Sequence, residues 1–112
     1  MTPSRRASVL LAGSAGAFLM VLGSASTASA VTTYATAPGV RVNVRSGPGT
    51  NYTITRTLVE NTRVPIFCQT PGTTVSGYYG TTNIWDNIDN GEYVSDAYIN
   101  TGSDGYIASR CA

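Results

Sequence analysis

Val40–Tyr52, with the sequence VRVNVRSGPGTNY, is the stretch that decides the fold of this chain. Val40, Val42 and Val44 are each followed by a polar side chain, and this period of two predicts a strand with one buried face. The second half, Ser46–Tyr52, contains Gly-Pro-Gly, which has one residue without a backbone donor and two that can take positive φ. We therefore expect a strand that runs into a stiff loop with a tyrosine at its far end.

Residues 1–30 have the pattern of a secretory signal peptide. Arg5 and Arg6 form a positive start, residues 9–22 form an apolar run, and Ala28-Ser29-Ala30 is a small-residue cleavage site. The apolar run is shorter than the roughly 20 residues that a membrane-spanning helix needs. The sequence therefore predicts a secreted protein, extracellular or associated with the cell wall and free of the membrane after cleavage. The general secretory route is expected, and the paired arginines leave the twin-arginine route open.

The charge of the predicted mature part argues against several classes of partner. Residues 31–112 carry five Arg, no Lys and six Asp plus Glu. Nucleic-acid binding needs a basic face that neutralises phosphates, and electrostatic membrane binding needs a similar surplus. We therefore expect neither nucleic acid nor membrane as a partner.

Two cysteines, Cys68 and Cys111, lie in the part predicted to be exported. In an oxidising compartment such a pair is expected to form a disulfide. A domain of about 80 residues has only a marginal hydrophobic core, so a cross-link of this kind matters for its stability.

The rest of the chain reads as short strands separated by turns. Residues 31–38 show no period and are expected to form a lead-in or mobile arm, before a domain at 39–112. No later stretch keeps a helical period, so five to seven short strands predict a small all-β barrel or sandwich. Further strands are expected at Thr53–Leu58, Arg63–Gln69, Ile84–Ile88, Glu92–Val94 and Tyr106–Ile107, with a hairpin-like excursion at Thr70–Asn83 that has a turn signal at Pro71-Gly72, a hairpin turn at Asn90-Gly91, and a tight turn at Ser95–Tyr98.

Catalysis and metal binding have little support in the residues. The chain has no histidine, and paired cysteines would leave no thiol, so Ser/His and Cys/His mechanisms are excluded. A wall hydrolase remains the least favoured alternative, because a glycosidase needs two carboxylates that face each other across a cleft. We predict no enzyme, no catalytic residue, no metal and no cofactor. The carboxylates lie in or beside turns, where solvation or capping is expected, and they are Glu60, Asp86, Asp89, Glu92, Asp96 and Asp104.

Several of these segments together resemble bacterial SH3-like domains, the cell-wall-associated relatives of the eukaryotic peptide-binding module. Asn43–Tyr52 resembles the opening motif of that family, and Thr57–Val64 looks like its second strand and turn. Trp85–Ile88 and Gly91–Ile99 look like the closing hairpin and terminal turn. The resemblance implies a small SH3-like barrel, here cross-linked by one disulfide between Cys68 and Cys111.

The resemblance also implies where a ligand would bind. In SH3-like folds, the loop after the first strand and the terminal turn border one groove. Tyrosine and tryptophan suit such half-exposed surfaces, because each pairs an apolar face with a polar tip. The expected groove residues are the aromatics Tyr52, Trp85, Tyr93 and Tyr98, with Asn51 and Asp96 as polar partners.

Two functions follow as hypotheses. The first is a secreted, non-catalytic module that binds a peptide of cell-wall peptidoglycan through this aromatic groove. The second is a secreted protein that binds another protein, for example as an inhibitor, on the same scaffold. Tyr79 in the Thr70–Asn83 excursion is the candidate contact for the second function, since exposed loops commonly carry recognition.

Overall fold

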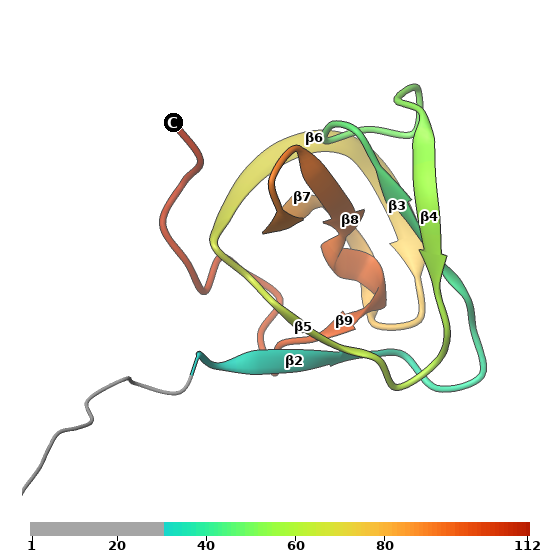
Figure 1. Ribbon diagram of the computed structural model, residues 1–112. Helices are drawn as coiled ribbons and strands as arrows, with labels where there is room; N and C mark the ends of the chain where they lie inside the picture. The colour runs from blue at the N-terminus through green and yellow to red at the C-terminus, as the bar shows by residue number, and fades with distance from the viewer. Residues whose placement is uncertain (1–30) are drawn as a thin grey trace, which may run out of the picture. The chain divides into compact units, whose positions relative to one another are not determined.

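The computed structural model describes residues 31–112, and the predicted signal peptide lies outside the described residues. Thr32–Ala112 forms one compact unit whose regular structure consists of strands and one 3-10 turn, joined by loops (Figure 1). This confirms the all-β prediction. In chain order the elements are β2 (Thr33–Thr36), β3 (Val42–Arg45), β4 (Ile54–Leu58), β5 (Arg63–Pro65), β6 (Cys68–Gly77), β7 (Gly80–Asp89), β8 (Glu92–Ser95), the single 3-10 turn η4 (Asp96–Tyr98) and β9 (Ile99–Asn100).

The strands form two antiparallel sheets. One has the order β5-β2-β9, and the other has the order β4-β3-β8-β7-β6. The opening strand β3 lies inside the larger sheet, and its alternation is confirmed because Val42 and Val44 are both buried. They pack in a core with Leu58, Val64, Ile88, Val94 and Ile99.

The loop 46–52 folds back on itself, for a reason different from the expected one. Neither Gly47 nor Gly49 has a positive φ. Glycine is needed at position 47 because the ring of Tyr52 lies against it and would overlap any Cβ. Arg45 holds the loop from β3, since its Nη1 donates to the carbonyl oxygens of Thr50 and Tyr52, both at 3.0 Å.

A prediction concerns Gly72, which lies in β6 where the pairing with β7 shifts register. The prediction of a turn at Pro71-Gly72 is wrong, because both residues belong to this long strand. A Cβ at Gly72 would overlap the backbone carbonyl of Pro48, which cannot move without moving the loop. We expect Gly72→Ala to lower the free energy of unfolding by about 1–3 kcal/mol. Urea denaturation would measure this loss.

The matched control is Gly105→Ala, because the nearest atom to its Cβ would be Ser103 Oγ at 3.9 Å. Equal stability of the Gly72 and Gly105 variants would contradict the close approach of β6 and the loop.

The chain before β3 differs from the prediction. The expected lead-in or mobile arm at 31–38 is wrong for Thr33–Thr36, which forms the central strand of the smaller sheet. Tertiary pairing overrides the weak local pattern here, because β2 pairs with β5 on one side and β9 on the other. β5 is an edge strand, as its Pro65 predicts.

The C-terminal tail also differs. The strand expected at Tyr106–Ile107 is absent, and the tail instead makes one parallel bridge between Arg110 and Gln69. The predicted disulfide between Cys68 and Cys111 is confirmed, and it joins this tail to the start of β6.

Thr70–Asn83 forms a hairpin, as expected. β6 and β7 pair along it, and Tyr78 and Tyr79 make the turn at its tip. In the described part of the chain, no helix is long and apolar enough to span a membrane.

Candidate functional site

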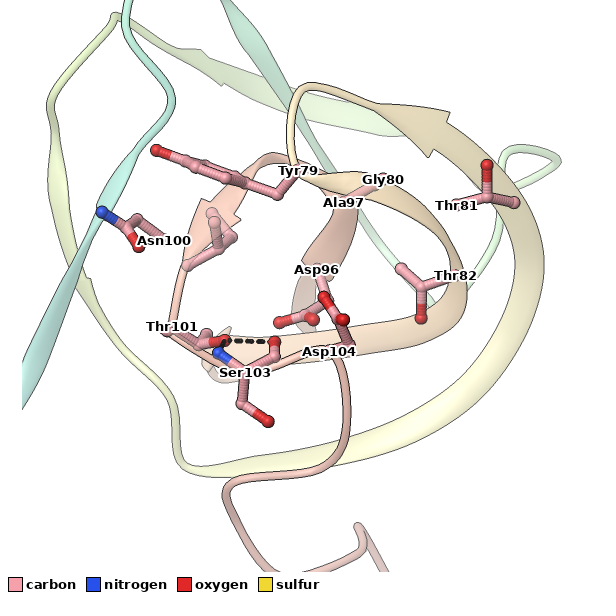
Figure 2. Close-up of a pocket in the computed structure, with 12 residues that line it drawn as sticks. Tyr79, Gly80, Thr81, Thr82, Asp96, Ala97, Asn100, Thr101, Ser103 and Asp104 are labelled. Carbon is pink, nitrogen blue, oxygen red and sulfur yellow. Dashed lines mark hydrogen bonds between the residues drawn. The ribbon is translucent and has the colours of Figure 1, made fainter.

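Two hollows border η4, which contributes Tyr98 to one and Asp96 with Ala97 to the other. The smaller, of about 180 Å³, is called here the Arg41 groove, and it is lined by Arg41, Val42, Asn43, Arg45, Thr50, Val75, Trp85, Ser95 and Tyr98. The larger, of about 400 Å³, is called the Asp96 pocket and is shown in Figure 2. It is lined by Tyr79, Gly80, Thr81, Thr82, Asp96, Ala97, Ile99, Asn100, Thr101, Gly102, Ser103 and Asp104.

The residues predicted to converge on one groove are divided between these hollows. Trp85 and Tyr98 line the Arg41 groove, whereas Asp96 lines the Asp96 pocket, together with Tyr79, the candidate contact for the second function. The structure thus shows two separate candidate sites. The remaining three predicted residues line neither hollow, and they are Asn51, Tyr52 and Tyr93.

Trp85 contributes less surface than expected. Its side chain is only 2% exposed, and its indole Nε1 donates a hydrogen bond of 2.8 Å to the carbonyl oxygen of Thr73. Trp85 therefore serves as a fixed wall of the groove and as a tie to the bulged part of β6. It offers no broad exposed platform on which a ring could stack.

Positive charge distinguishes the Arg41 groove. Arg45 is engaged by the loop carbonyls, whereas Arg41 is exposed and makes no hydrogen bond or ion pair with any residue from 31 to 112. The groove thus combines a free guanidinium with the tyrosine ring of Tyr98. A guanidinium binds carboxylates through paired hydrogen bonds, so this hollow suits an acidic peptide group.

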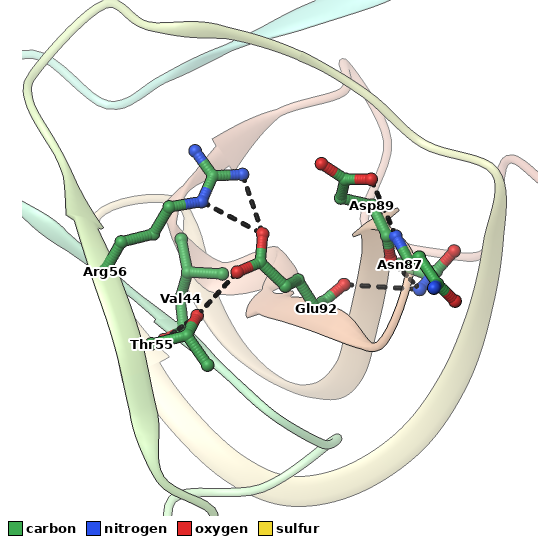
Figure 3. A network of polar contacts seen from close by, with 7 residues as sticks. Val44, Thr55, Arg56, Asn87, Asp89 and Glu92 are labelled. Atoms are coloured by element: carbon green, nitrogen blue, oxygen red, sulfur yellow. Dashed lines mark hydrogen bonds and ion pairs between the residues drawn. The ribbon is translucent and has the colours of Figure 1, made fainter.

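Glu92, the residue before Tyr93 in β8, belongs to a structural network. Next to Tyr93, Glu92 accepts hydrogen bonds from Thr55 Oγ1 at 2.8 Å and Arg56 Nε at 2.9 Å (Figure 3). The Arg56 and Thr55 hydrogen bonds hold the pKa of the Glu92 carboxyl below its usual value. These contacts join β4 to β8, and they face solvent away from both hollows.

Two carboxyl groups are buried where the sequence predicted solvated or capping residues. Asp86 is fully buried in β7, and Asp96 is 5% exposed at the start of η4. The prediction that Asp96 caps its turn is wrong, because the Ser95 hydroxyl accepts the capping hydrogen bond from the Ala97 amide. The alternation of Ile84, Asp86 and Ile88 on one face of β7 is the signal that could have placed Asp86 inside.

Gln69 connects this buried pair to the C-terminal tail. It lies opposite Asp86 on β6, and its Nε2 donates to Asp86 Oδ1 at 2.7 Å. Its Oε1 accepts hydrogen bonds from the amides of Ile107 at 2.7 Å and Ala108 at 2.9 Å. Gln69 Nε2, Gln69 Oε1 and Asp86 Oδ1 therefore all have hydrogen-bond partners.

The remaining buried oxygens of the two carboxyl groups, Asp86 Oδ2 and Asp96 Oδ1, indicate that the pair holds a proton. Asp86 Oδ2 and Asp96 Oδ1 are both buried, and no backbone or side-chain group among residues 31–112 donates a hydrogen bond to either atom. The two carboxyl groups interact with each other. Burial, together with the Asp96 side chain, raises the pKa of Asp86 to about 9. Burial also raises the pKa of Asp96, and the hydrogen bond from Asp86 opposes that rise. At neutral pH, Asp86 therefore holds a proton, and its hydrogen bond to Asp96 favours the ionised form of Asp96 against the effect of burial.

Metal ligation finds no support in the described residues, which hold no group of three or more His, Cys, Asp or Glu placed to bind an ion. No protein-family model matches the chain.

Two proteins of Bacillus subtilis (strain 168) are similar along most of their length. The chain is 46% identical to the uncharacterized protein YraJ over 103 residues, which covers 85% of this chain and 87% of YraJ. It is 47% identical to the uncharacterized protein YraI over 88 residues, which covers 71% of this chain and 74% of YraI. Identity at this level over this length means a shared fold and common descent, so this chain belongs to the family of YraJ and YraI.

Proposed function

We propose that the chain is a secreted, non-catalytic SH3-like module that binds a peptide of bacterial cell-wall peptidoglycan in the Arg41 groove. The observation that carries this proposal is the free guanidinium of Arg41 beside Tyr98 and the buried wall of Trp85. Stem peptides present carboxylates and short apolar side chains, which match a guanidinium and an aromatic rim.

The disulfide supports the extracellular part of the proposal, because such bonds persist in oxidising compartments. The position of two predicted elements supports the SH3-like part, since Thr50 of the loop after the first strand and Tyr98 of the terminal turn line the same hollow.

The direct test is co-sedimentation of the purified chain with purified cell walls. Binding is expected to place the protein in the pellet with walls and in the supernatant without them. Pelleting no greater than that of an unrelated protein of similar charge, across walls of different peptide composition, would refute the proposal.

A prediction follows for Arg41. Replacing it with Gln removes the free positive charge while keeping length and polarity, and we expect wall binding to weaken about tenfold, since charge-assisted hydrogen bonds contribute about 1.5–3 kcal/mol. The measurement is the pelleted fraction at increasing wall concentration.

Arg110→Gln is the matched control for that prediction, because Arg110 lies over the ring of Tyr106 in the tail and lines neither hollow. Equal losses for the two variants would show a non-specific effect of net charge and would count against the Arg41 groove.

A second candidate function is binding to a secreted protein through the tip of the β6–β7 hairpin. Tyr78 and Tyr79 are 56% and 37% exposed there, with their rings edge to face at a centroid distance of 4.8 Å. If this tip is the contact, Tyr78→Ala and Tyr79→Ala would each abolish a stoichiometric complex in a pull-down from spent medium. Tyr78 lines neither hollow, so Tyr78→Ala would leave wall pelleting unchanged.

A further inference from the structure

The Asp96 pocket differs from the Arg41 groove in the sign of its charge. Asp96 and Asp104 are the ionisable carboxyl groups of its lining, and no arginine lines it. The rest of the lining consists mostly of hydroxyl, amide and glycine residues, with Ala97 and Ile99 as apolar members and Tyr79 on the rim. In Figure 2 the side chains of Asp96 and Asp104 lie beside each other within the pocket.

Asp96 is a buried carboxyl group with no cationic partner among residues 31–112. Its side chain is 5% exposed, it interacts with the carboxyl group of Asp86, and no arginine lines the pocket. Asp104 is close enough to repel it and thereby to raise its pKa. A buried charge held next to a like charge costs free energy unless a counter-charge is present.

The support behind Asp96 is rigid. Gln69 orients Asp86, Asp86 donates to Asp96, and Ser95 caps the turn that carries Asp96. An acceptor that is fixed before a ligand arrives needs no ordering on binding, which favours affinity. The network thus presents one oriented carboxyl group to the pocket, with a second, exposed one on Asp104 beside it.

We propose that the Asp96 pocket binds the primary ammonium group of an amine-bearing ligand, with Asp96 and Asp104 as its acceptors. An ammonium group has three donors and no acceptor, so it can serve both carboxylates and a lining hydroxyl at once. Tyr79 on the rim then packs against the alkyl stem of the amine. The natural ligand, a side-chain amine of a wall peptide, is the part of this inference that rests on the proposed function.

The test uses a probe that is independent of cell walls. The full chain, labelled with nitrogen-15, is titrated with 1,5-diaminopentane and, separately, with 1,5-pentanediol, which has the same length and no charge. We expect the diamine to shift the amide resonances of residues 79–82 and 101–104, and the diol to shift none of them. Equal effects of the two compounds, or diamine shifts located elsewhere, would overturn the proposal.

A calcium chloride titration forms the third arm. Calcium ions prefer six to eight oxygen ligands, more than two carboxylates supply. Calcium that binds these residues and displaces the diamine at equal concentration would replace the ammonium site with a metal site.

Asp104→Asn supplies the matched variant, because Asp104 is exposed and lies outside the hydrogen-bond network of the buried pair. We expect it to raise the dissociation constant of the diamine about fivefold. Asp89→Asn, the same change at an exposed turn away from the pocket, should leave the constant unchanged. An unchanged constant in the Asp104 variant would overturn the assignment.

The results separate this inference from the proposed function. Diamine binding without wall pelleting would leave the ammonium site standing and remove the wall as its source. Wall pelleting without diamine binding would leave the Arg41 groove standing and remove the ammonium site.

Discussion

Asp86→Asn is expected to flatten the dependence of stability on pH. In the parent protein, burial and the Asp96 side chain raise the pKa of Asp86 to about 9 when folded, against 3.8 for an exposed aspartate. Between about pH 4 and pH 9, the folded protein therefore keeps a proton on Asp86 that the unfolded chain has already released. Stability falls as pH rises through this window, by at most about 1.4 kcal/mol per pH unit.

Asparagine reproduces the hydrogen bonds of the protonated acid. Its carbonyl oxygen can accept from Gln69 Nε2, and its amide can donate to Asp96 Oδ1, as the Asp86 proton does. The variant should therefore fold like the parent and lose the pH slope that comes from the pair. Relative to the parent, it should gain roughly 2–4 kcal/mol between pH 5 and pH 8.

Urea denaturation at pH 5, 6, 7 and 8 measures this difference. Starting at pH 5 avoids the effect of Glu92, whose lowered pKa gives stability that is lost only as pH falls below its ordinary value. Asp89→Asn is the control, and its slope should equal that of the parent. A parent protein whose stability is constant or rises from pH 5 to pH 8 would show that Asp86 is not the protonated partner.

Removal of the disulfide is the second large effect. The Cys68–Cys111 bond closes a sequence separation of 43 residues. Loss of this cross-link increases the entropy of the unfolded chain, and the loop-entropy relation gives about 4 kcal/mol for a loop of this length. This is a large part of the roughly 5–10 kcal/mol expected for a small domain.

The double variant Cys68→Ser with Cys111→Ser tests this by urea denaturation beside the parent under non-reducing conditions. The tail should remain placed while folded, because Cys111 N donates to the Gln69 carbonyl at 2.9 Å and Gln69 N donates to that of Ser109 at 2.9 Å. A loss below about 1 kcal/mol would contradict the entropic account. Reducing the parent with dithiothreitol should give the same loss as the double variant.

The fold could be predicted from the sequence where local patterns and tertiary pairing agree. The alternation at Val40–Val44, the turn at Asn90-Gly91 and the cysteine pair all lead to features that the structure contains. Asn61 takes the left-handed conformation, with a φ of 56°, which asparagine tolerates better than most residues do. The physical cause of each of these features is local, except for the disulfide, which forms where the surroundings are oxidising.

The rest depends on long-range contacts that no window of sequence displays. Thr33–Thr36 becomes a strand only because β5 and β9 flank it, and Gly47 is required by the position of a ring five residues away. The grouping of Asp86 with Asp96 needs the register of β7 against β8 and the turn after it. A carboxylate beside a turn signal therefore looked solvated although the fold buries it.

The candidate site shows the same limit. The motifs predict Trp85 and Tyr98 as groove residues, and both line one hollow. The sequence pattern places Arg41 only on the polar face of the alternating strand, although it lines the same hollow. Arg41 stands out only when the structure shows that Arg45 donates to the loop carbonyls and that Arg56 pairs with Glu92. The sequence does not contain these pairings.

The measurement that tests the central claim most directly maps the binding of soluble stem peptides on the folded protein. Stem peptides released from purified walls are titrated into the nitrogen-15-labelled chain, and the shifted amide resonances are assigned. The account predicts saturable shifts at residues 41–45, 95 and 98, lost in Arg41→Gln and kept in Arg110→Gln. Saturable binding with shifts confined to other residues, or no shifts at millimolar peptide, would contradict the assignment of the Arg41 groove as the wall-peptide site.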